Sequence, residues 1–113
     1  MEHSSQLLKG VLDMCLLALI SEEPSYGYEM VDKLQHRGLA LVSEGSIYPL
    51  LSRLQKKGFL TSALGSPTPE RGGKAKRIFS LQAEGRAALR ASLDGIREML
   101  SGTEEGLALG WSV

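Results

Sequence analysis

The spacing of apolar residues changes twice along this 113-residue chain, and the two changes limit the folds it can adopt. In the first half, apolar residues recur at helical spacing in three segments, separated by Pro24 and Gly38. Two short strand-like stretches follow at 59–64 and 77–81, and helical spacing returns from Ala83. The pattern predicts three helices, a β-hairpin and a last helix, which is a mainly α fold with one β-hairpin.

The expected helices cover about residues 6–20, residues 25–37, a segment from Ser43 or Ser46 to Gly58, and a segment from Ala83 to near Gly102. Ser25 is a suitable cap for the second helix, because its hydroxyl can accept a hydrogen bond from a free amide of the first turn. For the third helix, Pro49 favours Ser46 over Ser43 as the cap, since a proline in the first turn has no amide bond to lose.

The length fits one structural unit, which we divide into a main domain at 1–81, a C-terminal helix at 82–102 and a tail at 103–113. The single cysteine, Cys15, excludes a disulfide framework and fits a reducing cytoplasm. The most apolar stretch, Val11–Ile20, is about half the ~20 residues that a membrane span requires, so we expect a core helix there and no membrane association.

The formal net charge is zero, but positive charge is concentrated in the middle of the chain. Residues 46–80 hold seven Lys or Arg side chains against one Glu, a local net charge of +6; the seven are Arg53, Lys56, Lys57, Arg71, Lys74, Lys76 and Arg77. A localised basic segment in a neutral chain is typical of a surface that binds a polyanion. On charge alone, a basic surface that contacts only solvent is as good an interpretation as a surface that binds a polyanion.

The third helix has two different faces. Its expected core face carries Ile47, Leu50, Leu51 and Leu54, and its opposite face carries Ser46, Pro49, Arg53 and Lys56. The opposite face lacks large aliphatic side chains, so the helix could approach a DNA duplex closely, and Arg53 could reach a phosphate or a guanine edge. Tyr48 borders this face and could stack or donate to a phosphate.

Three helices followed by a hairpin is the arrangement of a winged helix-turn-helix. The hairpin tip offers Lys74, Lys76 and Arg77 around a Gly-Gly pair, which suits contact with a minor groove or the flanking backbone. Because side chains alternate along a strand, Ile78 and Phe79 point to opposite faces of the hairpin. We therefore expect one of these two apolar side chains to be partly exposed.

The last helix carries an apolar seam, made by Leu89, Leu93, Ile96 and Leu100 at heptad-like spacing. The first helix carries a second apolar stripe, which includes Leu12, Leu16 and Leu19. A chain this small is not expected to bury both stripes within one copy. The two stripes together therefore predict a homodimer interface.

Several stretches carry a family resemblance: Leu7-Leu8-Lys9-Gly10, Tyr26-Gly27-Tyr28-Glu29, Ser43-Glu44-Gly45-Ser46-Ile47-Tyr48-Pro49-Leu50-Leu51-Ser52-Arg53-Leu54, Gly58-Phe59-Leu60 and Gly73-Lys74-Ala75-Lys76-Arg77-Ile78-Phe79-Ser80-Leu81. Over about residues 6–90 the chain resembles the PadR family of bacterial transcriptional regulators. Its short C-terminal region is similar to the small branch of that family, which has a single C-terminal helix.

The resemblance implies a homodimeric winged-helix protein, usually a repressor, that binds a palindromic double-stranded DNA operator. It implies that the third helix enters the major groove, that the wing follows the backbone or minor groove, and that the first and last helices form the dimer. Ser46 and Tyr48 match the family's DNA-contacting helix positions, and Lys74 and Lys76 match its basic wing. Gln82 stands where such sequences usually have a capping Thr. The resemblance also allows a small-molecule effector of unknown identity as a further partner.

Other chemistry finds little support in the sequence. His3, His36 and Cys15 share no metal-ligand spacing, and Gly73-Lys74 lacks the glycine and hydroxyl residue of a phosphate-binding loop. We expect no enzyme activity, metal or cofactor. The alternative function is a small helical dimer that binds protein partners through its leucine seam. Binding that weakens steeply with salt would favour DNA, because apolar burial does not release counterions.

Overall fold

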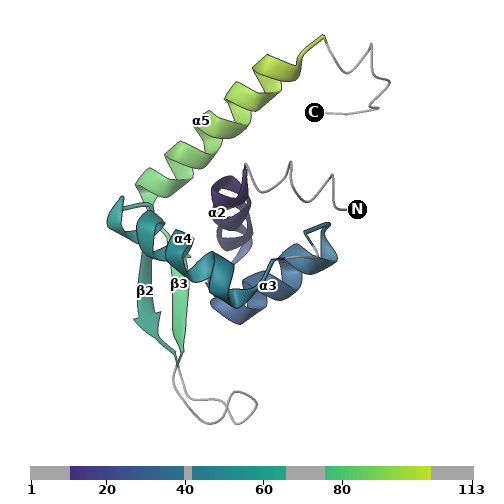
Figure 1. Cartoon of the computed structure of the whole chain (residues 1–113). Coiled ribbons are helices and arrows are strands. Elements are labelled where there is room, and N and C mark those ends of the chain that lie inside the picture. Colours follow the sequence, from purple (N-terminus) through teal and green to yellow (C-terminus); the bar gives the residue numbers. More distant parts are fainter. Residues whose placement is uncertain (1–10, 40–41, 66–75, 103–113) are drawn as a thin grey trace.

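The computed structural model describes residues 11–39, 42–65 and 76–102. Three sequence predictions lie outside these residues: the start of the first helix, Lys74 in the wing tip, and the tail with Trp111. The elements are α2 (Leu12–Glu22), β1 (Ser25–Tyr26), α3 (Gly27–His36), α4 (Glu44–Lys56), β2 (Leu60–Leu64), β3 (Arg77–Leu81) and α5 (Ala83–Leu100). The mainly α fold with a β-hairpin wing is confirmed (Figure 1).

A strand that the sequence analysis missed joins the hairpin. The three strands are antiparallel in the order β1-β3-β2, and Ser25 lies opposite Phe79. The prediction that Ser25 caps the second helix is wrong, because this residue is in β1 and its hydroxyl donates to the Glu23 carbonyl. Tyr26 is the N-cap of α3 instead, and its amide donates to the Glu29 carboxylate at 2.8 Å.

The start of α4 also differs from the prediction. Ser43 is the N-cap, and Ser46 is the third helical residue, whose hydroxyl accepts a hydrogen bond from the Ser43 amide at 3.0 Å. The preference for Ser46 as the cap was therefore wrong. Because this reciprocal capping starts the helix after Ser43, about one turn before the predicted start, Pro49 lies inside the helix. A proline has no amide hydrogen, so the Gly45 carbonyl lacks its usual donor within the helix. Gly58, with a φ of 84°, follows the end of α4 as expected.

The core lies where α2, α3, α4 and the hairpin meet. Its fully buried members include Leu16, Met30, Ile47 and Leu51. In β3 the predicted alternation is confirmed, since Phe79 is buried in this core while Ile78 is only partly buried. None of the helices in the described part of the chain is long and apolar enough to cross a membrane.

Helix α5 packs against α2, and the buried residues of α5 are in its first half. Leu89 is buried there, whereas the second half of α5 projects beyond the other elements (Figure 1). The N-cap of α5 is Gln82, the residue at which the family pattern has Thr, and its side chain makes no capping hydrogen bond. Its backbone amide instead donates to the Phe59 carbonyl at 2.9 Å, which attaches the start of α5 to the turn before β2.

Ion pairs link the ends of α2 and α3. The Arg37 guanidinium donates to both carboxylate oxygens of Glu22 at 3.0 Å, and Lys33 pairs with Glu23 at 3.0 Å. The hydrogen bonds from Arg37 hold the pKa of the Glu22 carboxyl below its ordinary value. Since a lowered carboxyl pKa stabilises the fold at neutral pH, this small contribution is lost as the pH falls through that lowered value.

Candidate nucleic-acid interface

The polar face of α4 is turned to solvent. Ser46, Pro49, Arg53 and Lys56 are all exposed, as expected from their spacing. Gly45 and Ser52 are exposed on the same side, and the sequence analysis did not single them out. The spacing could have identified them, because Ser52 and Lys56 follow Gly45 by seven and eleven residues and so lie on the same side of a helix. This side of α4 presents small and basic side chains without a large apolar one.

Arg53 is engaged within the protein. Its Nη2 donates to both oxygens of Asp13, on α2, at 2.9 and 3.1 Å. Both side chains remain about half exposed, so the pair has the low energy of a surface ion pair, roughly 0 to 1 kcal/mol. Asp13 is a residue that the sequence analysis missed, because it lies 40 positions from its partner.

Tyr48 lies at the opposite border of the α4 face. It is 39% exposed, and its phenol ring lies against Gly27 at the start of α3. The ring is therefore available to solvent on one side and packed against backbone on the other. This position is compatible with the stacking or phosphate contact expected from the sequence.

The described part of the wing lies beside α4. Arg77 is exposed and Lys76 is half-buried, so Arg77 is the more exposed of these two cations. The Arg77 guanidinium donates to the Ser62 hydroxyl at 3.1 Å, and that hydroxyl donates to the Gln55 side chain at 3.1 Å. This chain of hydrogen bonds joins the two strands of the wing to the last turn of α4.

The residues predicted to form a dimer interface have two different environments. Leu12, Leu16, Leu19 and Leu89 are buried within one copy, at 7%, 0%, 3% and 7% exposure. They are covered because α2 lies between α5 and the rest of the domain. Leu93 is 40% exposed, while Ile96 and Leu100 are partly buried. Met99, which the sequence analysis did not name, is 78% exposed. Of the residues predicted to form the interface, those that are not buried within one copy are therefore all on α5.

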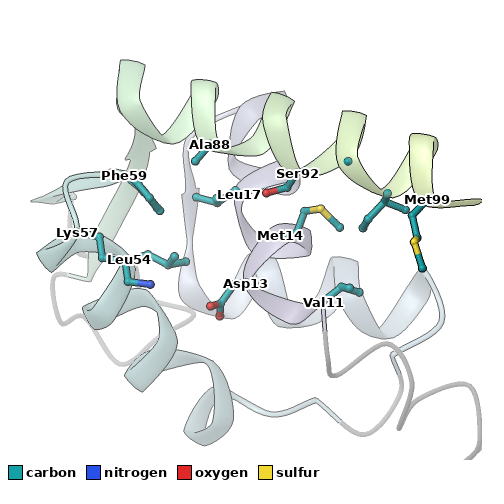
Figure 2. Close-up of a pocket in the computed structure, with 12 residues that line it drawn as sticks. Val11, Asp13, Met14, Leu17, Leu54, Lys57, Phe59, Ala88, Ser92 and Met99 are labelled. Atoms are coloured by element: carbon teal, nitrogen blue, oxygen red, sulfur yellow. The ribbon is translucent and has the colours of Figure 1, made fainter.

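A groove of about 470 Å³ lies between α2, α4 and α5 (Figure 2). Its walls are mostly apolar, and its polar groups include Asp13, Lys57 and Ser92. Asp13 thus takes part in the groove and in the ion pair with Arg53. A molecule bound at the Asp13 side of the groove would change the surroundings of the residue that holds Arg53.

Metal and thiol chemistry have no support in the described residues. Among residues 11–39, 42–65 and 76–102, no three His, Cys, Asp or Glu side chains form a group that could hold a metal ion. Burial raises the pKa of the Cys15 thiol. The thiol is therefore protonated at neutral pH and is a weak nucleophile.

Comparisons with known proteins agree on one family. The profile of the "Transcriptional regulator PadR-like family" matches residues 16–91. A PadR-like transcriptional regulator from Bacillus cereus is 38% identical, with a TM-score of 0.75 over 91% of this chain and 96% of its own. A PadR family transcriptional regulator from Eggerthella lenta is 28% identical, with a TM-score of 0.77 over 90% of this chain and 86% of its own. An uncharacterized protein from Lysinibacillus sphaericus is 31% identical over 107 residues, covering 91% of this chain and 96% of its own.

Proposed function

This chain belongs to the PadR-like family of transcriptional regulators, and from that premise we propose that it is a repressor that binds a palindromic DNA operator as a homodimer. The observation that carries this proposal is the exposed polar face of α4, which lies next to the wing. A helix with small side chains and scattered cations can enter a major groove while an adjacent hairpin follows the backbone. A DNA partner and the single cysteine both support a cytoplasmic location as part of this proposal.

The proposed contacts divide into two groups. Ser46, Tyr48, Arg53 and Lys56 of α4 would lie at the major groove, supported by their shared exposure. Lys74, Lys76 and Arg77 would lie along the backbone or minor groove as phosphate contacts. Contacts of the second group add affinity without sequence preference, because phosphates are the same at every base pair.

The proposed dimer uses the exposed apolar surface of α5. Leu93, Ile96 and Met99 lie on the second half of α5, where a second copy could cover them. Ile96 and Met99 also line the groove beside α2, so the proposed dimer surface and the groove share these two residues. A dimer with two-fold symmetry presents two copies of α4, and this requires an operator with inverted half-sites. We propose that a small-molecule effector releases the dimer from DNA by binding in the groove beside Asp13, which has the size of a ligand site.

Selection from a pool of random-sequence DNA duplexes tests the function. We expect the recovered duplexes to share an inverted repeat with half-site centres about 10 base pairs apart. Affinity for the most enriched duplex, followed by fluorescence anisotropy, should fall steeply with salt, because each phosphate contact contributes roughly 0.9 to the slope of log K against log salt. Recovery of no preferred sequence, together with salt-insensitive binding of a protein partner, would favour the alternative of a helical interaction module.

Arg53 and Asp13 give a sharper test of the groove contacts. A bidentate guanine contact is worth about 1 to 3 kcal/mol, which exceeds the energy of the exposed ion pair, so DNA should draw Arg53 away from Asp13. We expect Arg53→Ala to weaken binding to the selected duplex by about that amount. Asp13→Ala should tighten binding several-fold, since it removes a carboxylate that competes for the guanidinium.

The matched control is Asp13→Ala in the Arg53→Ala background. There the carboxylate has no guanidinium to hold, so the tightening due to competition should be absent. Equal loss on selected and scrambled duplexes in Arg53→Ala would make Arg53 a phosphate contact. Unchanged binding to both duplexes would remove it from the interface.

A further inference from the structure

The phenol ring of Tyr48, on α4, rests on a backbone position that has no side chain. Its neighbour is Gly27, the first residue of α3, which is buried. A Cβ atom at Gly27 would lie 2.6 Å from Cζ and 2.9 Å from Cε1 of Tyr48, closer than real Cβ contacts come. The glycine therefore allows the ring, and with it the first half of α4, to approach the start of α3.

A second ring-on-glycine contact lies at the base of the wing. The Tyr26 ring rests on Gly65, where a Cβ atom would lie 2.7 Å from Cε1 and 2.8 Å from Cζ. The Gly65 amide donates to the Lys76 carbonyl at 2.7 Å, which joins the two wing strands at the end of the described hairpin. The ring thus contacts the wing at the point from which its basic tip extends.

The two contacts meet at consecutive residues, Tyr26 and Gly27. The backbone there is held on one side by pairing of Tyr26 with Ile78 of β3, and on the other by the Glu29 cap of α3. The Tyr28 ring stacks on the Tyr26 ring with a centroid distance of 5.6 Å. The dipeptide is therefore a fixed support, against which both α4 and the wing are placed.

We propose that the Tyr26-Gly27 dipeptide positions both DNA-contacting segments, with Gly27 setting the place of α4 and Gly65 setting the place of the wing. This inference rests on the proposed DNA-binding function. Protein interiors are close-packed, so a methyl group at either glycine has to displace the ring that covers it. Displacement of Tyr48 moves the ring, and with it the contacts that α4 presents to base edges, where hydrogen bonds tolerate little error in distance and angle. Displacement of Tyr26 shifts the wing relative to phosphates.

The test for Gly27 compares affinities for the selected duplex and for a scrambled duplex of the same composition. A variant that is only less stable loses both affinities in proportion to the folded fraction, so their ratio is unchanged. We expect Gly27→Ala to lower this ratio at least tenfold. In a Tyr48→Ala background, Gly27→Ala should change the ratio less than twofold, because the new methyl group then meets no ring.

The test for Gly65 uses a different readout. Gly65→Ala should weaken binding to both duplexes and give a shallower salt dependence, with an unchanged ratio of affinities. A Lys74→Ala, Lys76→Ala double variant provides the reference slope for a wing that has lost phosphate contacts. A salt slope for Gly65→Ala equal to that of the unmodified protein would overturn the role of Gly65.

Three results would overturn the role of Gly27: an unchanged ratio in Gly27→Ala, an equal fall of the ratio in both Tyr48 backgrounds, or loss of folding that Tyr48→Ala does not rescue. If Gly27→Ala alone fails to fold, a folded Gly27→Ala, Tyr48→Ala protein supports the proposal, since it identifies the ring as the obstacle. Failure of the proposed function is a separate result, in which the unmodified protein prefers no duplex at all.

Discussion

Replacing Leu93 by glutamate should convert the proposed dimer to a monomer and remove most of its affinity for the operator. Leu93 is 40% exposed on the projecting half of α5, next to the partly buried Ile96. A dimer that covers this surface would have to take the new carboxylate out of water, and even with Arg90 and Arg97 beside it this desolvation costs several kcal/mol. Binding of the second half-site would then no longer be linked to the first, and this linkage is typically worth about 10²- to 10⁴-fold in affinity.

The matched control is Ala91→Glu. Ala91 is exposed and lies two positions before Leu93, so the same charge is placed on the opposite side of the same helix. Light scattering should show a dimer for the unmodified protein and for Ala91→Glu, but a monomer for Leu93→Glu. A dimer of unchanged mass for Leu93→Glu would show that α5 does not carry the interface.

Gly85→Ala should destabilise the protein, although alanine is the better helix former by about 1 kcal/mol. Gly85 is the third residue of α5, and its Cβ position is occupied by the backbone carbonyl oxygen of Phe59. A methyl group there would also lie 2.8 Å from Cδ1 of Leu81. Backbone atoms cannot change rotamer, so α5 would have to move off the turn and lose the hydrogen bond from Gln82 to Phe59. We expect overpacking to cost about 1 to 3 kcal/mol.

Thermal unfolding at one fixed protein concentration measures this effect. The midpoint should fall by roughly 4 to 8 °C per kcal/mol for a domain of this size. Gly95→Ala is the control on the same helix, because its Cβ would meet nothing within 4 Å. It should be neutral or stabilise the helix by about 0.5 to 1 kcal/mol. If Gly85→Ala and Gly95→Ala behave alike, the close approach at Phe59 does not limit this position.

Local spacing along the chain was sufficient to predict the hairpin and the faces of α4. The strands expected at 59–64 and 77–81 are β2 at Leu60–Leu64 and β3 at Arg77–Leu81. Alternation and helical periodicity are properties of neighbouring residues, so they can be read without knowing what packs against them. The same argument explains why the exposure of Arg53 and Lys56 was predicted correctly.

Errors at element boundaries arose where a distant or reciprocal contact outweighed local preference. A two-residue strand at Ser25–Tyr26 has too few residues to show alternation, and it exists because β3 supplies hydrogen-bonding partners more than 50 positions away. The cap at Ser43 depends on a reciprocal bond with Ser46, which spacing along the chain does not reveal, and it makes Pro49 the sixth residue of the helix.

The chain sequence therefore established the order of the helices and the hairpin, the basic middle segment and the apolar stripes, because each of these is a pattern of residue types. It did not establish what covers a stripe or holds a charge. Leu12, Leu16 and Leu19 are buried within one copy, and Arg53 pairs with Asp13, because packing brings together surfaces that are remote in sequence. The contacts of the Tyr48 ring with Gly27 and of the Tyr26 ring with Gly65 are also decided by packing. A glycine in a sequence does not reveal which side chain will lie against it.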